Sequence, residues 1–133
     1  MRLTRRYRFS ASHRLHVEAL GLEENRRLFG KCNNPYGHGH DYVLELTLAG
    51  SPDETGQVAN RDKLDGFVAE RVLRRLDHRN LNADVSELAS IPPTTENLAS
   101  AIQTMLKKDW PFAARLDRIR ISETGRNIFE LDS

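Results

Sequence analysis

The stretch GHGHDYVLELTLA, residues 37–49, decides the fold of this 133-residue chain. From Tyr42 to Leu48, leucines and a tyrosine occupy every second position. Alternation with a period of two predicts a strand from about Gly39 to Leu48 that is buried on one face. Residues two apart on a strand project to the same side, so His38 and His40 at its start aim two imidazoles at one point.

The segment before this strand contains a second strand and a loop. Residues 3–13 alternate apolar and polar side chains, many of them arginines, which predicts a half-buried strand with Arg5 as an exception on the apolar face. Residues 18–34 are mixed and polar and contain two glycines. We therefore expect a long surface loop there, of a length that is usually functional or disordered.

Two helices are expected after the strand at 39–48. Residues 60–76 repeat apolar side chains every four positions, which predicts an amphipathic helix capped by Asn60. The run Pro92–Thr95 predicts the start of a second helix, which ends at Trp110.

The last part of the chain predicts a hairpin. Residues 116–123 and 127–132 alternate apolar side chains on either side of a Thr-Gly-Arg turn. The order strand, strand, helix, helix, strand, strand favours an α+β fold with a four-stranded antiparallel sheet covered by two helices on one face. No internal repeat or linker interrupts the chain, so residues 1–133 are expected to form a single domain.

Composition excludes several classes of function. Twenty Lys and Arg against nineteen Asp and Glu leave a net charge of +1, too little for the basic field that binds nucleic acid. No apolar run approaches the roughly 20 residues that span a bilayer, so no membrane partner is expected. The single cysteine, Cys32, excludes an internal disulfide framework and fits a reducing compartment, so the protein is expected to be cytoplasmic.

Three histidines stand where they can converge. His13 ends the first predicted strand, and His38 and His40 begin the next one. Three neutral imidazoles with a fourth, open position are typical of a catalytic zinc site. The alternative is that they are surface histidines, or core histidines satisfied by hydrogen bonds.

Other residues are candidates for proton transfer. Cys32 follows Lys31, and a thiol beside a cation or a metal has the lowered pKa that a general base or nucleophile needs. Alternatively it is a small buried hydrophobe. The pair Asp77 and His78 suits a proton relay, or else a charge cluster at the end of a helix.

Glu123 ends the third predicted strand on the apolar parity, an unusual place for a carboxylate. Either it pairs with Arg120 or Arg126, or it accepts two parallel bonds from a ligand with a fork of N–H donors, such as a pterin or guanine. No dinucleotide-binding or P-loop glycine motif is present, which disfavours nicotinamide and nucleotide enzymes.

Several motifs, in one order along the chain, resemble the 6-pyruvoyl-tetrahydropterin synthase family. They are FSASHRL (9–15), LFGKCNNPYGHGH (28–40), LDHRNL (76–81), TTEN (94–97) and ET (123–124). The match runs from Arg5 to about Asn127.

The resemblance implies the tunnelling fold, in which trimers close a β-barrel and two trimers stack into a homohexamer. It also implies an enzyme of tetrahydrobiopterin biosynthesis, a carbon-oxygen lyase acting on phosphate. Such an enzyme converts 7,8-dihydroneopterin triphosphate to 6-pyruvoyl-tetrahydropterin with loss of triphosphate.

The residue roles implied by the resemblance fall into three groups. The zinc (Zn²⁺) ligands are His13, His38 and His40; the proton-transfer triad is Cys32, Asp77 and His78; the pterin is bound by Glu123, Thr94, Thr95 and Glu96. In this family the pocket lies between subunits, so the triad is expected to be completed on assembly. Candidates to meet the triphosphate are Arg8, Arg14, Arg27 and Lys31, among which the sequence does not choose.

Two alternatives stay open. One is the similar 6-carboxy-tetrahydropterin synthase of queuosine biosynthesis, although the five residues Asn33–Gly37 between Cys32 and His38 favour the pyruvoyl enzyme. A variant that cleaves the side chain toward folate has Glu in place of Cys32, which speaks against it here. The other is a zinc-binding oligomeric scaffold without turnover, against which the intact Cys32, Asp77 and His78 argue.

Overall fold

The computed structural model describes residues 1–133 and contains five strands and four α-helices. The strands are β1 (Arg2–His13), β2 (His38–Ala49), β3 (Arg79–Asn80), β4 (Arg115–Ser122) and β5 (Ile128–Asp132). The α-helices are α1 (Leu22–Phe29), α2 (Arg61–Val68), α3 (Arg74–Leu76) and α4 (Thr95–Lys107). Short helical turns are η1 (Gly30–Asn33), η2 (Ala69–Leu73) and η3 (Ser86–Leu88).

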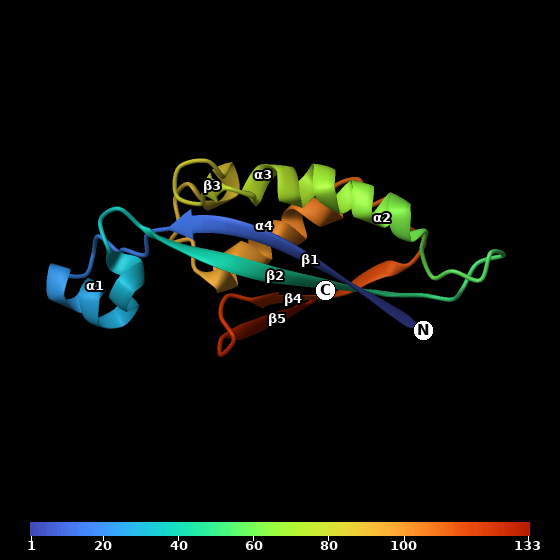
Figure 1. Ribbon diagram of the computed structural model, residues 1–133, viewed down its shortest axis with the longest axis horizontal. Coiled ribbons are helices and arrows are strands. Elements are labelled where there is room, and N and C mark those ends of the chain that lie inside the picture. Colours follow the sequence, from blue (N-terminus) through green and yellow to red (C-terminus); the bar gives the residue numbers. More distant parts are fainter.

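The strands form one sheet in the order β3-β1-β2-β4-β5 (Figure 1). The four long strands are antiparallel, as the sequence predicts. The expected four-stranded sheet gains a fifth strand, because β3 pairs in parallel with Ala11 and Ser12 of β1. Two backbone bonds flank this pairing: the N–H of His78 donates to the carbonyl of Ser10, and that of Leu81 to the carbonyl of Ser12. A pairing of two residues is too short to leave a pattern in the sequence.

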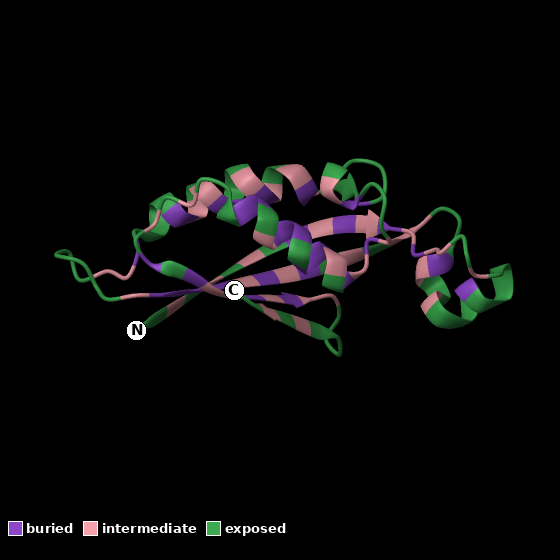
Figure 2. Ribbon diagram, turned by 180° about the vertical axis from the view of Figure 1, so that it is seen from behind, coloured by how far each residue is buried: buried purple, intermediate pink, exposed green.

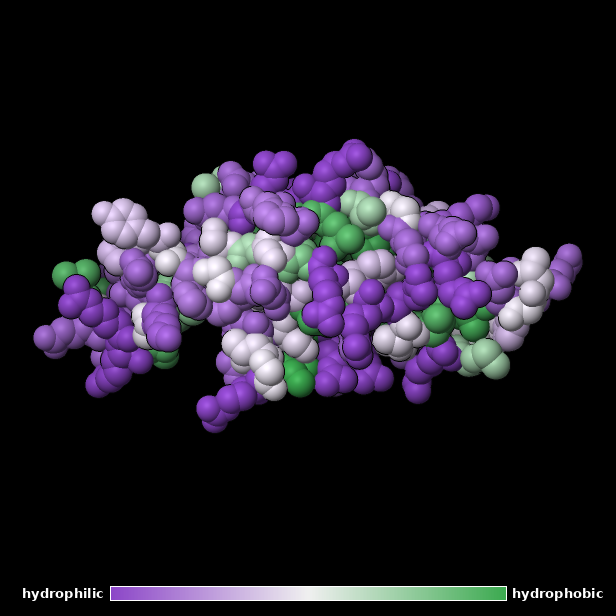
Figure 3. All heavy atoms as spheres, viewed as in Figure 1, coloured by the Kyte–Doolittle hydropathy of each residue, from purple (hydrophilic) through white to green (hydrophobic).

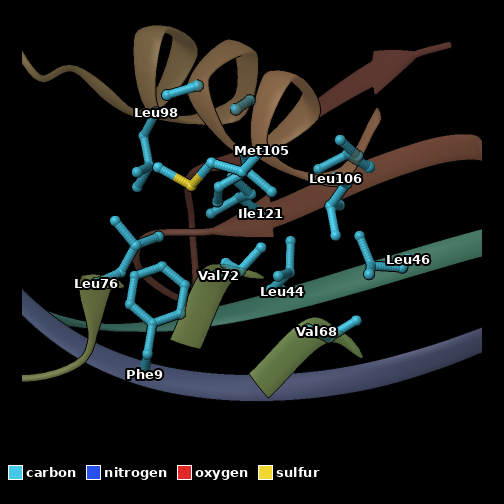
Figure 4. Close-up of a cluster of buried hydrophobic side chains, with 14 of the residues drawn as sticks. Phe9, Leu44, Leu46, Val68, Val72, Leu76, Leu98, Met105, Leu106 and Ile121 are labelled. Atoms are coloured by element: carbon cyan, nitrogen blue, oxygen red, sulfur yellow. The ribbon is translucent and has the colours of Figure 1, made fainter. Parts of the chain in front are cut away.

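The helices α2, α3 and α4 cover one face of the sheet (Figures 1 and 2). One cluster of 24 buried apolar residues fills the space between the two layers. Figure 4 shows Leu44 and Leu46 of β2 and Ile121 of β4 facing Val72 and Leu98 of the helices. The predicted helix at 60–76 is confirmed as the run α2–η2–α3, and the Asn60 side chain accepts the capping bond from the N–H of Lys63.

Arg5, the basic residue on the apolar face of β1, has a partner in α2. Its guanidinium donates two hydrogen bonds to the carboxylate of Asp65, and the hydroxyl of Tyr7 donates a third at 2.8 Å. The arginine holds the pKa of the Asp65 carboxyl below its ordinary value. The pair therefore ties α2 to β1 at the rim of the core.

The prediction of a loop over residues 18–34 is wrong. This segment forms α1 and η1, which project from one end of the sheet (Figure 1). Acidic Glu23 and Glu24 lie in the first turn of α1, where the helix dipole favours them. The buried side chain of Asn25 bonds the backbone of Val17 and Leu20, so one polar residue organises a segment that has little apolar periodicity.

None of the helices combines the length and the apolar composition that a membrane-spanning helix needs.

Shortening a buried side chain of β2 tests this packing. Leu46 is fully buried, and Leu46→Ala is expected to lower the free energy of unfolding by about 2–5 kcal/mol, because it removes apolar contacts and leaves a cavity. Chemical denaturation measures the effect. The matched control is Leu22→Ala on α1, whose side chain is largely exposed, and equal losses for the two variants would contradict the assigned core.

Candidate active site

The register of β1 against β2 brings the histidines together. His13 pairs directly with His38, and Ala11 pairs with His40. All three histidines stand on the core-facing parity, at the end of the sheet next to α1. The imidazole centroid of His40 lies 4.8 Å from that of His13 and 4.7 Å from that of His38. The donor atoms of His13 and His40 come together, and the ring of His38 borders that of His40 without bringing its donor atom into the group.

The imidazole of His13 is held by a backbone carbonyl. His13 is fully buried, and its Nδ1 lies 2.8 Å from the carbonyl oxygen of Pro93, just before α4. A carbonyl oxygen only accepts hydrogen bonds, so Nδ1 carries the proton and donates. The lone pair of His13 is therefore on Nε2, which lies 3.1 Å from Nε2 of His40.

A thiol and a carboxylate complete the cluster. Sγ of Cys32 lies 3.6 Å from Nε2 of His40. Oε1 of Glu123, which follows β4, lies 3.5 Å from Nε2 of His40 and 4.0 Å from Nε2 of His13. Glu123 thus faces the imidazoles and makes no ion pair with Arg120, whose guanidinium lies near Glu45 and Glu130 instead.

Burial sets the protonation states in this cluster. It lowers the pKa of His13 and His40 below the ordinary value of histidine, which favours neutral imidazoles. Burial, and then the nearby Glu123 carboxylate, raise the pKa of the Cys32 thiol. Neutral imidazoles are the form that binds a metal, and a bound cation would oppose the effect of burial on the thiol.

The donor atoms fit a metal ion. The ligand atoms of His13, Cys32 and His40 all lie within 4.8 Å of one another. Bonds of about 2.0–2.3 Å in a tetrahedral zinc site separate nitrogen and sulfur ligands by roughly 3.3–3.6 Å. The separations of 3.1 Å between the two nitrogens and 3.6 Å between nitrogen and sulfur are close to these values. His38, predicted as a ligand, lies outside this group, although its ring borders that of His40.

Asp77 and His78 lie apart from the cluster. They occupy the turn between α3 and β3, where Oδ1 of Asp77 lies 3.1 Å from Nδ1 of His78 and accepts the N–H of Ser10. The His78 side chain is 83% exposed. His78 and Asp41 line an open hollow of about 520 Å³, and His40 of the cluster lines the same hollow. Within one chain, neither residue contacts Cys32.

The predicted pterin-binding segment begins α4. The hydroxyl of Thr94 caps the helix by accepting the N–H of Asn97 at 3.2 Å. Thr95 is buried and its hydroxyl has no hydrogen-bond partner, whereas Glu96 is exposed. Pro93 directly precedes this segment and holds His13, so α4 begins beside the cluster.

Two features of the site were not predicted. The carbonyl of Pro93 orients His13, but a backbone group leaves no signal in the sequence. Tyr42, the next core-facing residue after His40, is almost fully buried and its hydroxyl has no partner. Its ring stacks on Phe9 and lies edge-on to His40. It was not predicted as a site residue because it alternates with the leucines of β2, as an ordinary core residue does.

The fold and the cluster define an α+β protein with a candidate metal site at one end of its sheet. A family model described as 6-pyruvoyl tetrahydropterin synthase matches residues 2–133. The chain is 46% identical to 6-pyruvoyl tetrahydrobiopterin synthase of Poecilia reticulata and 45% identical to that of Homo sapiens, over 95% of this chain and 86% and 87% of those proteins.

A solved structure extends the similarity to the fold. The 6-pyruvoyl tetrahydropterin synthase of Caenorhabditis elegans superposes with a TM-score of 0.91 at 40% identity, over 100% of this chain and 95% of that one. The chain belongs to the 6-pyruvoyl tetrahydropterin synthase family.

Metal binding tests the cluster directly. His40 lies between the other donors, so His40→Ala is expected to lose the bound metal ion in elemental analysis of protein reconstituted with zinc. His16→Ala is the matched control, because His16 bonds Asn33 and lies outside the cluster. Equal metal content in the two variants would remove His40 from the ligand set.

Proposed function

We propose that this protein converts 7,8-dihydroneopterin triphosphate to 6-pyruvoyl-tetrahydropterin with elimination of triphosphate, in tetrahydrobiopterin biosynthesis. The observation that carries the proposal is the convergence of His13, His40, Cys32 and Glu123 at one end of the sheet. Curated relatives at 45–46% identity have the matching name. In this proposal the protein is a carbon-oxygen lyase that acts on phosphates.

In this proposal the metal is zinc, held by the imidazoles of His13, His38 and His40. When bound, zinc supplies Lewis acidity that acidifies the C–H bonds beside the hydroxyl groups of the substrate side chain. The bond from His13 to the carbonyl of Pro93 fixes one imidazole in the tautomer that a metal requires.

Cys32 is the proposed general base. Its sulfur lies beside His40 and is half-buried, so a deprotonated thiol can reach a side-chain proton of a substrate bound at the imidazoles. The substrate side chain then reduces the imine of its own ring, and no nicotinamide is needed. This agrees with the absence of a dinucleotide-binding motif.

Glu123 is the proposed anchor of the pterin ring. Its carboxylate faces the cluster, where it can accept two parallel bonds from the amino and ring N–H groups of a pterin. The segment of Thr94, Thr95 and Glu96 follows Pro93, whose carbonyl bonds His13, and in this proposal the unpartnered hydroxyl of Thr95 is a donor or acceptor for the ring.

Asp77 and His78 are proposed to act on the site of a second subunit. They form a carboxylate-imidazole pair in which the His78 side chain is 83% exposed and that of Asp77 is 42% exposed. His78 also has a φ of 59°, a left-handed backbone conformation that is uncommon outside glycine. A shared site explains why one chain keeps this pair away from its own Cys32.

We propose assembly into closed trimers, two of which form a hexamer, and the unpaired sheet edges support the joining of neighbouring chains. One edge of β1 is unpaired apart from its short contact with β3, and β5 is paired only with β4. A row across the exposed sheet face alternates in charge, in the order Arg6, Glu45, Arg120 and Glu130. Docking β5 against β1 of the next chain continues both the antiparallel order and this alternation.

Replacement of the proposed base separates an enzyme from a scaffold. Cys32→Ala is expected to lower turnover by about a hundredfold or more, because proton abstraction loses its base. The zinc content and the oligomeric state are expected to be unchanged, as elemental analysis and native mass spectrometry will measure. Full turnover would exclude Cys32 as the base, and loss of zinc would make it a metal ligand.

Charge reversal at the sheet edge tests the assembly. Glu130→Lys puts like charges next to Arg6 of the neighbouring chain and is expected to shift native mass spectra from hexamers toward smaller species. Glu54→Lys, in an exposed loop, is the control of equal charge change. An unshifted Glu130→Lys hexamer would rule out the docking of β5 on β1.

A further inference from the structure

A hollow of about 350 Å³ opens between α1 and the start of β2, beside the candidate active site. The side chains of Arg26, Lys31 and His38 line it, with two asparagines, a glycine and a proline. No carboxylate and no large apolar side chain reaches it. Such a lining suits an anionic, strongly hydrated ligand and does not suit an apolar one.

The two basic residues at this hollow are not neutralised. Neither Arg26 nor Lys31 has a carboxylate within ion-pair distance, whereas the adjacent Arg27 pairs with Glu24. A second arginine-lined hollow at the other end of the sheet differs in this respect. Its residues Arg2 and Arg115 both pair with Asp117.

The turn at the end of α1 places Arg26 and Lys31 beside the candidate active site. Gly30 ends α1 with a φ of 55°, and its N–H donates to the carbonyl of Arg26. This turn puts Arg26, in the last turn of α1, and Lys31, after it, over the same hollow. Lys31 directly precedes Cys32, and His38 borders both the hollow and the imidazole of His40.

We propose that Arg26 and Lys31 bind the triphosphate group of the substrate and stabilise it as it leaves. This inference rests on the proposed function, in which triphosphate is eliminated from the side chain. A substrate anchored by its ring at Glu123 then passes the imidazoles and ends at the two free cations. Charge-assisted bonds from guanidinium and ammonium groups are the usual means of holding phosphate.

The geometry also narrows the candidates that the sequence left open. Arg14 donates to the carbonyl of Asn33 and to His16. Arg27 is engaged with Glu24, and Arg8 stands on the exposed parity of β1. Of the four candidates to bind the triphosphate, only Lys31 remains, and the structure adds Arg26.

Inorganic tripolyphosphate is the probe that tests this inference without chemistry. Isothermal titration calorimetry on the zinc-loaded full chain compares the wild type with Arg26→Gln and Lys31→Gln at low ionic strength. Each variant is expected to weaken binding about fivefold, the effect of losing one partly exposed charge pair. In turnover, KM for the triphosphate substrate is expected to rise while the zinc content stays constant.

Arg27→Gln is the matched control, since it removes a neighbouring arginine that is already paired. Equal tripolyphosphate affinity in all four proteins, or equal losses for Arg26→Gln and Arg27→Gln, would overturn the inference. Turnover by the wild type with KM unchanged in both test variants would also overturn it and leave the proposed function standing. Selective tripolyphosphate binding by a protein without turnover would instead keep the hollow as a polyphosphate site and reject the enzyme.

Discussion

The antiparallel register between β1 and β2 is the constraint on which the rest of the structure depends. It sets His13 opposite His38 and Ala11 opposite His40, on the face that the helices cover. A slip of β2 by one residue would turn His38 and His40 to the other face and would expose the leucines of β2. The core residues that fix the register therefore also fix the geometry of the candidate metal site, so that changes in the packing of β1 and β2 affect both stability and the site.

Much of this arrangement could be predicted from periodicity. Apolar side chains alternate in residues 39–48 and recur every four positions in residues 60–76, and both patterns mark the buried face of their element. The sheet and helix layers form because these buried faces pack against each other. The helix α1 was missed because a single buried polar residue, Asn25, organises it. The histidines were found because they continue the buried parity of two strands, whereas the carbonyl of Pro93 leaves no trace in side-chain identity.

The electrostatics divide the molecule into two sides. On the helix-covered side, burial lowers the pKa of His13 and His40, and the Glu123 carboxylate faces them, which suits a cation and a ring with N–H donors. On the other side, one row of alternating charge, Arg6, Glu45, Arg120 and Glu130, crosses the sheet from β1 to β5. Figure 3 shows the hydrophilic side chains that cover much of the surface in that view. Asp77 and His78 are not among the donor atoms of the cluster within one chain, and the proposed function places them at the site of a second subunit.

The most direct test is mass spectrometry of the products formed from 7,8-dihydroneopterin triphosphate by the purified protein without nicotinamide, before and after removal of zinc. The account predicts 6-pyruvoyl-tetrahydropterin and free triphosphate, and their loss when the metal is chelated. A 6-carboxy product would move the protein to the queuosine branch. No product from assembled, zinc-loaded protein would contradict the assignment of an enzyme.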